Sequence, residues 1–247
     1  MIYCCANCCI NNTNFCNLCL SFRTNNKFTT NYMISLKNAK NKLSLKYRDV
    51  YTILEIIGLP EKLTHLKYSY DLIFGWDYDN IPCSAMIKNF PPNLIVLDCT
   101  YNNIINFNYL PPILKILNCS HNQITNLDNL PQTLKILNCS HNKITNLDNL
   151  PLGLTELDCS HNQITNLDNL TNDIIKLNCS CNKIINLDNL PNSLEYLYCD
   201  SNPINNYFSL PHNLKVVNDV TYADKDSKNL IIKCLGNYKR YVCKNIK

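Results

Sequence analysis

Glycine is scarce in this sequence, supplying only 4 of its 247 residues. Glycine-rich loops that cradle phosphate groups, of the form GxGxxG or GxxxxGKS/T, are therefore absent. The sequence also lacks an HExxH zinc motif, an EF-hand loop and any recognisable motif that combines serine, histidine and an acid. From these absences we expect a protein that is not an enzyme.

Long apolar segments are missing as well. No run approaches the roughly 20 apolar residues of a membrane-spanning helix, and the chain start lacks the charged and apolar regions of a secretory signal. The net charge is +4, with 17% charged and 46% hydrophobic residues, which excludes both a polycation and an acidic disordered chain. We predict a folded, cytoplasmic protein without a membrane span.

Cysteine is abundant, with 16 in the chain, and six of them recur at one constant interval. The surrounding sequence repeats with them as LxxLxCxxNxIxxLxxLP, so residues 91–210 form six consecutive units. Within each unit, the alternation LxC indicates a short strand whose Leu and Cys face the same way. One unit cannot bury that apolar face alone, so the units must stack and share a core. The six cysteines are Cys99, Cys119, Cys139, Cys159, Cys179 and Cys199.

The pattern resembles that of the leucine-rich repeat family, most closely its short, bacterial-type class, which is also seen in large amoeba viruses. The resemblance implies a curved, right-handed solenoid with a parallel β-sheet on its concave side, and a location in the host cytoplasm if the source is viral. About nine residues remain for each return segment, fewer than most helices need, so we expect mostly non-helical convex returns. Residues 59–71 also resemble the opening of FNIP-type repeats.

Composition divides the chain into five segments. Residues 1–32 form a cysteine-rich leader, residues 33–58 a basic segment that we predict to be helical, and residues 59–90 a degenerate repeat with an insertion of about eleven residues. The six regular repeats occupy residues 91–210, and residues 211–247 form a terminal half repeat with a basic cap. The net charges of residues 1–90, 91–210 and 211–247 are +4, −5 and +5. The acidic middle disfavours nucleic acid as a partner.

Two repeating columns have an ordinary structural explanation. The recurring asparagine, for example Asn122, stands where the chain leaves the strand. There its side chain can form hydrogen bonds with the backbone of the turn and of the neighbouring unit. The cysteine column occupies a core slot, and its side chains point the same way rather than toward each other. We therefore predict buried free thiols and a scaffold role for asparagine.

The outward residues of successive strands should form an extended binding surface on the concave face. Aliphatic residues at one end and tyrosines at the other form a mixed apolar and polar strip, of the kind that protein partners use. Duplication alone would also produce such columns. The predicted partner-binding residues are Val96, Asp98, Tyr101, Lys115, Ile116, Asn118, His121, Lys135, Ile136, Asn138, His141, Glu156, Asp158, His161, Lys176, Asn178, Cys181, Glu195, Tyr196 and Tyr198.

Two ladders could have further chemistry. The column that runs from His121 to Cys181 could share Zn²⁺ or resist protonation, although parallel side chains do not converge tetrahedrally. Four carboxylates, Asp128, Asp148, Asp168 and Asp188, line up on the return segments. Turn capping by the neighbouring asparagines is their ordinary explanation, with divalent cation binding as the alternative.

The amino terminus contains two cysteine pairs, Cys5 with Cys8 and Cys16 with Cys19, joined by only seven residues. Four thiolates at this spacing are candidate zinc ligands, and zinc is the one cofactor that the sequence suggests. The alternatives are palmitoylation and a disordered leader before an effective start near Met33.

The function predicted from these features is a non-enzymatic protein-interaction module that binds a protein partner through the concave face. A first alternative, drawn from the resemblance, is an adaptor in ubiquitin transfer, with residues 33–58 as a helical docking element. A second alternative is a nucleic-acid-associated protein that uses an amino-terminal zinc module at residues 5–19.

Overall fold

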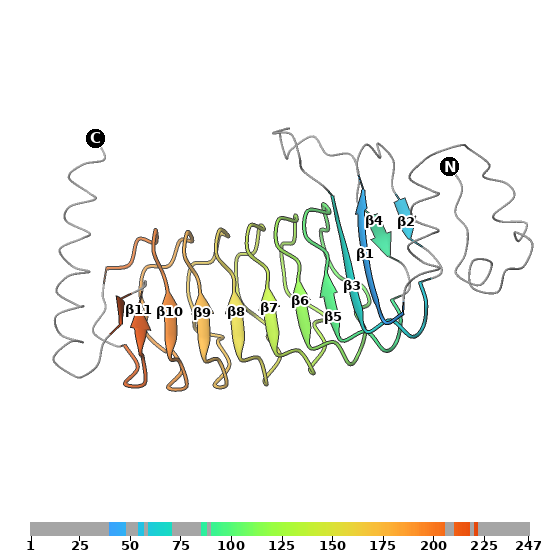
Figure 1. The fold of residues 1–247 in the computed structure, drawn as a ribbon. Helices are drawn as coiled ribbons and strands as arrows, with labels where there is room; N and C mark the ends of the chain where they lie inside the picture. Colours follow the sequence, from blue (N-terminus) through green and yellow to red (C-terminus); the bar gives the residue numbers. More distant parts are fainter. Residues whose placement is uncertain are drawn as a thin grey trace, which may run out of the picture.

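The computed structural model describes residues 40–47, 54–56, 59–70, 85–87, 90–205, 210–217 and 220–221. The chain winds into a solenoid in which successive coils place their strands side by side in one ten-stranded sheet (Figure 1). The strand order is β1-β3-β5-β6-β7-β8-β9-β10-β11-β12, and a second sheet pairs β2 with β4. Neighbouring strands are parallel throughout, except for β11 and β12.

The regular array contributes six strands of three residues each. Each strand pairs with its neighbour exactly one repeat away, so that equivalent side chains lie next to each other, as Leu117 and Leu137 do. The return segments contain no helix in the described part of the chain, which confirms the predicted solenoid with non-helical returns. The six strands are β5 (Val96–Asp98), β6 (Ile116–Asn118), β7 (Ile136–Asn138), β8 (Glu156–Asp158), β9 (Lys176–Asn178) and β10 (Tyr196–Tyr198).

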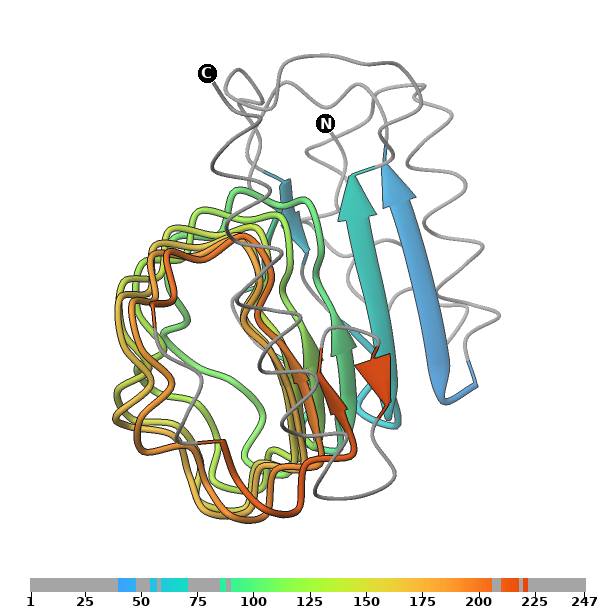
Figure 2. The ribbon, with the colours of Figure 1, turned by 90° about the vertical axis from the view of Figure 1, so that its left-hand side faces the viewer.

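The core runs along the inside of the coils. Figure 2, which looks along the solenoid, shows the strands on one side of the coils and the return segments on the other. Each strand turns its central residue inward, for example Leu137, and the cysteine that follows is at most 1% exposed in all six repeats. All six are free thiols, as predicted. Burial raises the pKa of the thiols of Cys119 and Cys139, which keeps them protonated.

A ladder of buried asparagines joins adjacent coils, which confirms their predicted scaffold role. The side-chain amide nitrogen of Asn142 donates to three carbonyl oxygens at 3.0 to 3.1 Å, those of Cys119, Cys139 and Ser140. Its oxygen accepts the backbone N–H of Ile124 in the preceding coil at 2.9 Å. One side chain therefore satisfies backbone groups in two coils at once, and the pattern recurs in the other repeats.

Positive φ angles close the turns of each coil. His121, His141 and His161 have φ of 52° to 54°, and Asn129, Asn149 and Asn189 on the return have φ of 62° to 66°. Asparagine tolerates this left-handed conformation better than most residues, which explains how the turns form with so little glycine. At the histidines, inter-coil hydrogen bonds hold the backbone, as from the His121 N–H to the Ser140 carbonyl at 3.0 Å.

The amino-terminal end of the sheet differs from the prediction. Residues 33–58 do not form a helix where they are described: β1 (Lys42–Tyr47) and β2 (Leu54–Ile56) are strands. The apolar residue Leu43 is buried and pairs in register with Leu66 of β3 (His65–Tyr70), so the alternation of a strand determines this segment. The parallel partner of β2 is β4 (Ala85–Ile87).

The degenerate repeat contributes β3, which pairs with β5 across a return longer than that of a regular repeat. Leu66 lies opposite Leu97, whereas Leu97 itself lies opposite Leu117 on the next strand. Leu63, Leu66 and Tyr68 are buried in the core, in the slots that the repeat pattern assigns to them. The predicted site of the extra residues, near 75–84, lies outside the described residues.

The sheet closes differently at its other end. There, β11 (Val216–Val217) continues the parallel arrangement of the array. The short strand β12 (Val220–Thr221) then reverses direction and pairs with it. The sheet therefore ends on an antiparallel pair within the segment predicted as the terminal cap.

Candidate functional site

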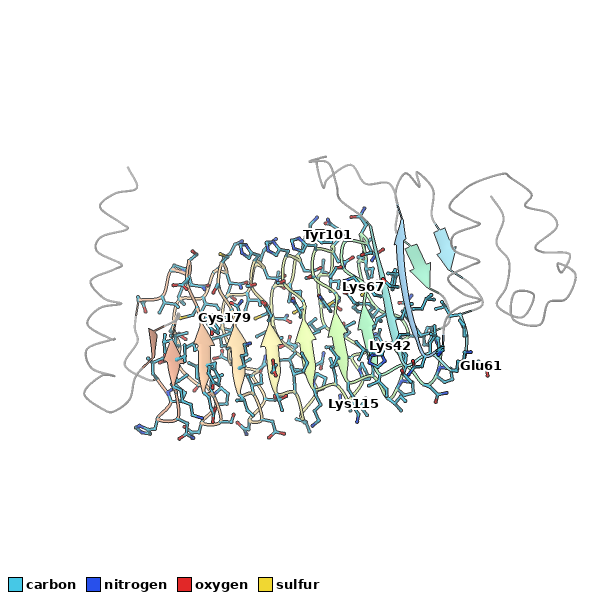
Figure 3. The ribbon with its side chains drawn as sticks, in the orientation of Figure 1. Lys42, Glu61, Lys67, Tyr101, Lys115 and Cys179 are labelled. Carbon is cyan, nitrogen blue, oxygen red and sulfur yellow. The ribbon has the colours of Figure 1, made fainter. Side chains whose placement is uncertain are left out.

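The described side chains form two distinct outward surfaces. The first, here called the sheet face, consists of the strand residues that point away from the core together with the residue before each strand. The second lies along the edge of the solenoid where the strands end. Figure 3 shows Tyr101 at this edge. It shows Lys115, which belongs to the sheet face, near the opposite edge, where the strands begin. The sequence predicts the residues of both surfaces as one group, and the structure separates them.

An aliphatic strip crosses the first half of the sheet face. Val96, Ile116 and Ile136 lie next to each other in the register of the sheet and are half-buried. Farther along the same face, Ile175 stands just before β9 and is 40% exposed. These side chains are fixed by the sheet and leave part of their apolar surface in water, which is the condition for a partner to bury them.

The charged groups of the sheet face are partly paired. Lys67 forms an ion pair with Asp98 near the first end, and Lys215 pairs with Glu195 at 2.7 Å near the other. Lys135 donates to the carbonyl oxygen of Gly153 at 2.9 Å. These contacts restrain the charged side chains at both ends and in the middle of the sheet face.

One column of the predicted binding residues also has a structural task. The Oδ1 atom of Asn138 accepts hydrogen bonds from the N–H of Ser140 at 3.0 Å and from its hydroxyl at 2.8 Å. Asp158 makes the same two bonds to Ser160, at 3.1 and 2.7 Å. This column therefore shapes the turn after each strand. Equivalent bonds involve Asp98, Asn118 and Asn178.

The second end of the sheet face is aromatic. Tyr196 and Tyr198 project outward on either side of the buried Leu197, and both are half-buried. Glu156 and Lys176 lie on the two strands before them, β8 and β9. The face therefore changes from aliphatic to charged and then to aromatic along the solenoid.

The edge column consists of stacked rings. Ring centroids lie 4.2 Å apart for Tyr101 and His121, 4.1 Å for His121 and His141, and 3.9 Å for His141 and His161, with interplanar angles of 11° to 16°. The prediction that these residues belong to the sheet face is wrong in position. Each strand ends before the ring residue, as β6 does at Asn118, and the left-handed turn carries the ring to the edge.

Burial and neighbouring rings favour the neutral form of two imidazoles in the stack, those of His121 and His141. Burial, together with repulsion from His141 and His161, lowers the pKa of His121 from 6.5 to about 4. Burial and His161 also lower the pKa of His141, although the carboxylate of Asp158 acts in the opposite direction. Two protonated rings about 4 Å apart repel each other strongly, so protonation of one ring opposes protonation of the next. This repulsion is the resistance to protonation that the sequence predicts.

An open groove of about 420 Å³ runs beside the stack. Below, it is called the edge groove. The amide and amine side chains that follow the asparagine ladder line it together with the rings. Besides Asn122 and Asn142 of the ladder, its lining residues are Tyr101, Asn103, His121, Gln123, His141, Lys143 and His161.

The ladders do not form a metal site in the part of the chain that the structure describes, where no three His, Cys, Asp or Glu side chains are placed to hold an ion. On the returns, Asn149 donates to the carboxylate of Asp128 at 2.9 Å, and Asn189 donates to that of Asp168 at 3.2 Å. The backbone N–H of Asp128 bonds to Asn126 at 3.3 Å. Asparagine hydrogen bonds thus account for this ladder, as turn capping predicts.

The amino-terminal cysteines are a separate matter. Cys5, Cys8, Cys16 and Cys19 lie outside the described residues, and their zinc site stays a prediction.

Within the described residues, no helix combines the length and apolar character that crossing a bilayer requires.

Comparison with solved structures identifies the fold. The leucine-rich repeat domain of a Shigella effector matches with a TM-score of 0.58 and 24% identity, over 75% of this chain and 81% of that domain. YopM from Yersinia enterocolitica matches with a TM-score of 0.49 and 24% identity, over 72% of this chain and 44% of YopM. The functional domain of InlJ from Listeria monocytogenes, which includes a cysteine ladder, matches with a TM-score of 0.43 and 25% identity, over 72% of this chain and 48% of that domain.

The chain thus has the leucine-rich repeat fold, with the short repeats that its sequence predicts. Its match spans less than half the length of YopM. No family model and no curated protein matches the sequence. Stacked repeats of this fold present an extended surface of side chains on a rigid sheet.

Proposed function

We propose that the protein binds a protein partner through its sheet face, and that the aliphatic strip and the two tyrosines supply most of the binding energy. The observation that carries this proposal is the in-register row of Val96, Ile116 and Ile136, with Tyr196 and Tyr198 farther along the same face. Apolar and tyrosine side chains held on strands bind at a low entropic cost because their positions are already fixed.

The charged residues between the two ends set orientation. Glu156 and Lys176 lie side by side on β8 and β9 and offer charges of opposite sign. A partner with complementary charges at this position would bind in one register only, since mismatched charges cost energy without a compensating pair. The structural column that includes Asn138 contributes little beyond its turn.

The described residues do not provide the helix that the adaptor alternative requires. It required a docking helix over residues 33–58, and the described parts of that segment are β1 and β2. The nucleic-acid alternative depends on cysteines outside the described residues.

Affinity capture with variant proteins tests the proposal. In the test variant, Ile116, Ile136, Tyr196 and Tyr198 are changed to Glu. The control variant carries Glu at three exposed residues of the returns. We expect partners captured by the unaltered chain to be lost with the first variant and kept with the second, with both variants retaining the circular dichroism spectrum of the fold. Equal capture by the two variants would contradict the proposal. The control positions are Thr125, Thr145 and Thr165.

A further inference from the structure

The aliphatic strip of the sheet face lies between two charges of opposite sign. One outward row of side chains can be followed across six strands, because each residue pairs in register with the next. The row begins with a base on β1 and ends with an acid on β8. Its members, in the order of the sheet, are Lys42, His65, Val96, Ile116, Ile136 and Glu156.

The charges at the two ends of this row are available to a partner. Lys42 and Glu156 form no ion pair with any described residue, whereas Lys67 and Asp98, in the neighbouring outward row, pair with each other. Lys42 is exposed at the start of β1 (Figure 3), and Glu156 is half-buried. A partner that satisfies both ends must therefore offer an acid at one end and a base at the other, with an apolar surface between them.

A second copy of this chain offers that arrangement when it faces the first with its coils in the opposite order. A two-fold axis that lies between the two faces, parallel to the strands, reverses the order of the coils and keeps the direction of the strands. With the axis between β5 and β6, Lys42 of one copy lies opposite Glu156 of the other, and Val96 lies opposite Ile116. Strands that run in similar directions are the usual geometry of two sheets packed face to face.

The residues beside the row fit the same arrangement. Lys115, just before β6, lies opposite Ile95, and Lys135, just before β7, lies opposite Thr64. Lys176 on β9 lies outside the overlap, which ends at β8. At 0.15 M salt, repulsion between the net charges of the two copies is screened beyond about 8 Å, so these local contacts decide. The overlap is about 24 Å long, a length that favours a weak, reversible dimer.

We propose that the protein associates with a second copy of itself through the aliphatic strip, with the coils in opposite order and Lys42 of each copy paired with Glu156 of the other. The inference rests on the proposed function, because it takes the sheet face as the binding surface and identifies one partner that this face fits. Burial of Val96 and Ile116 at the centre supplies the affinity, and the two ion pairs fix the register. The tyrosines of β10 lie outside the overlap and stay available to another protein.

Sedimentation equilibrium of the full chain tests this inference, in 0.15 M salt and with a reductant that keeps the cysteines as thiols. We expect the average mass to rise from 28.5 kDa toward twice that value as the concentration increases from about 5 to about 500 µM. Ile116→Glu should keep the chain monomeric over this range, because it would bury two charges at the centre of the interface. Circular dichroism verifies that this variant keeps the fold.

Charge reversal locates the contact. Lys42→Glu and Glu156→Lys each place like charges opposite one another at both ends of the overlap, so either change should weaken the dimer by about tenfold or more. The chain that carries both changes has opposite charges there again, with the signs exchanged, and should recover the original affinity to within about threefold. Lys143→Glu, a change in the edge groove and away from the sheet face, should leave the affinity unchanged.

The inference is overturned if the full chain stays monomeric at every concentration, if the dimer survives both single reversals, or if the double reversal does not recover it. The proposed function would fail in a different experiment, through equal capture of partners by its test and control variants. A monomeric chain whose partners are still lost with that test variant would overturn the self-association and support the proposed function.

Discussion

The regular array and the amino-terminal end of the sheet use the same parallel pairing but differ in how the chain returns. In the array every strand has three residues and lies one repeat from its neighbour. At the amino-terminal end, β1 and β3 have six residues each, and the returns that separate β1, β3 and β5 are unequal in length. The comparison shows that the sheet requires a continuous inward column, here Leu43, Leu66 and Leu97, and not a constant return length.

The asparagine ladder reaches across the boundary between the two regions. Asn102 in the first regular repeat donates to the carbonyl oxygen of Tyr68 in β3 at 3.0 Å. The degenerate coil thus accepts the same inter-coil bond as a regular one. The two regions differ in return length and share the bonds that fasten one coil to the next.

The largest difference between the regions should come from core truncation. Leu137→Ala removes a side chain that is 1% exposed and packed between coils on both sides, and we expect a loss of about 3 to 4 kcal/mol in the free energy of unfolding. Leu43→Ala lies in the first strand of the sheet, and we expect about half that loss. Urea denaturation followed by circular dichroism measures both, and equal losses would show that the two regions are packed alike.

Removal of the ladder amide should also depend on position. Asn142→Ala leaves the buried N–H of Ile124 without its partner and removes one of two donors from each of three carbonyl oxygens, and we expect a loss of about 2 kcal/mol in the free energy of unfolding. Asn202→Ala breaks the equivalent bonds where the side chain is half-buried and water can replace them, so about 1 kcal/mol is expected. Urea denaturation gives both values. Thr145→Ala, on an exposed return, is the control with an expected change below about 0.5 kcal/mol.

One irregular position lies within the array. Thr171 stands where the other repeats have proline, and its buried hydroxyl has no hydrogen-bond partner among the described residues. Thr171→Val keeps the shape and removes the unsatisfied group, so we expect the free energy of unfolding to rise by about 1 kcal/mol. A thermal or urea midpoint lower than that of the unaltered chain would show that the hydroxyl has a partner in solution.

Acid should lower the free energy of unfolding of the array through its ring stack. This is the smallest of the four effects predicted here. The pKa of His121 is lower in the folded state, about 4 against 6.5, so the unfolded chain binds more protons between these values. Its stabilising contribution is complete above pH 6.5 and is lost as the pH falls toward 4. His121→Asn should therefore reduce the drop in urea midpoint between pH 7 and pH 4.5. An identical drop in both proteins would contradict the role assigned to this ring.

The sequence predicts the regular array well because each apolar slot has one consistent periodic interpretation. Leu117, Cys119 and Asn122 occupy in the structure the roles that their spacing indicates. The prediction fails at β1 because only Leu43 and Leu45 mark the strand there, and Lys40 stands where the repeat pattern would place a leucine. A single alternating pair between lysines fits a helix face as well as a strand.

The binding surfaces were only partly predictable for a related reason. Alternation correctly places Ile116 outward, but the chain leaves the strand after Asn118, and a left-handed φ at His121 ends the alternation. Ring stacking between coils depends on that turn. The repeating histidines were the available signal, and their constant spacing alone could not show that their faces meet.

The asparagine ladder has a consequence for how this molecule can change in size. Each coil offers the carbonyl oxygen of its core cysteine and the N–H of one isoleucine to the asparagine of the next coil, and offers its own asparagine to the coil before. An inserted copy of residues 131–150 would therefore find its partners already in place. Tandem duplication would separate the two ends by about 4.8 Å per added copy. The number of repeats therefore sets the length of the solenoid, and added copies leave the side chains of the existing repeats unchanged.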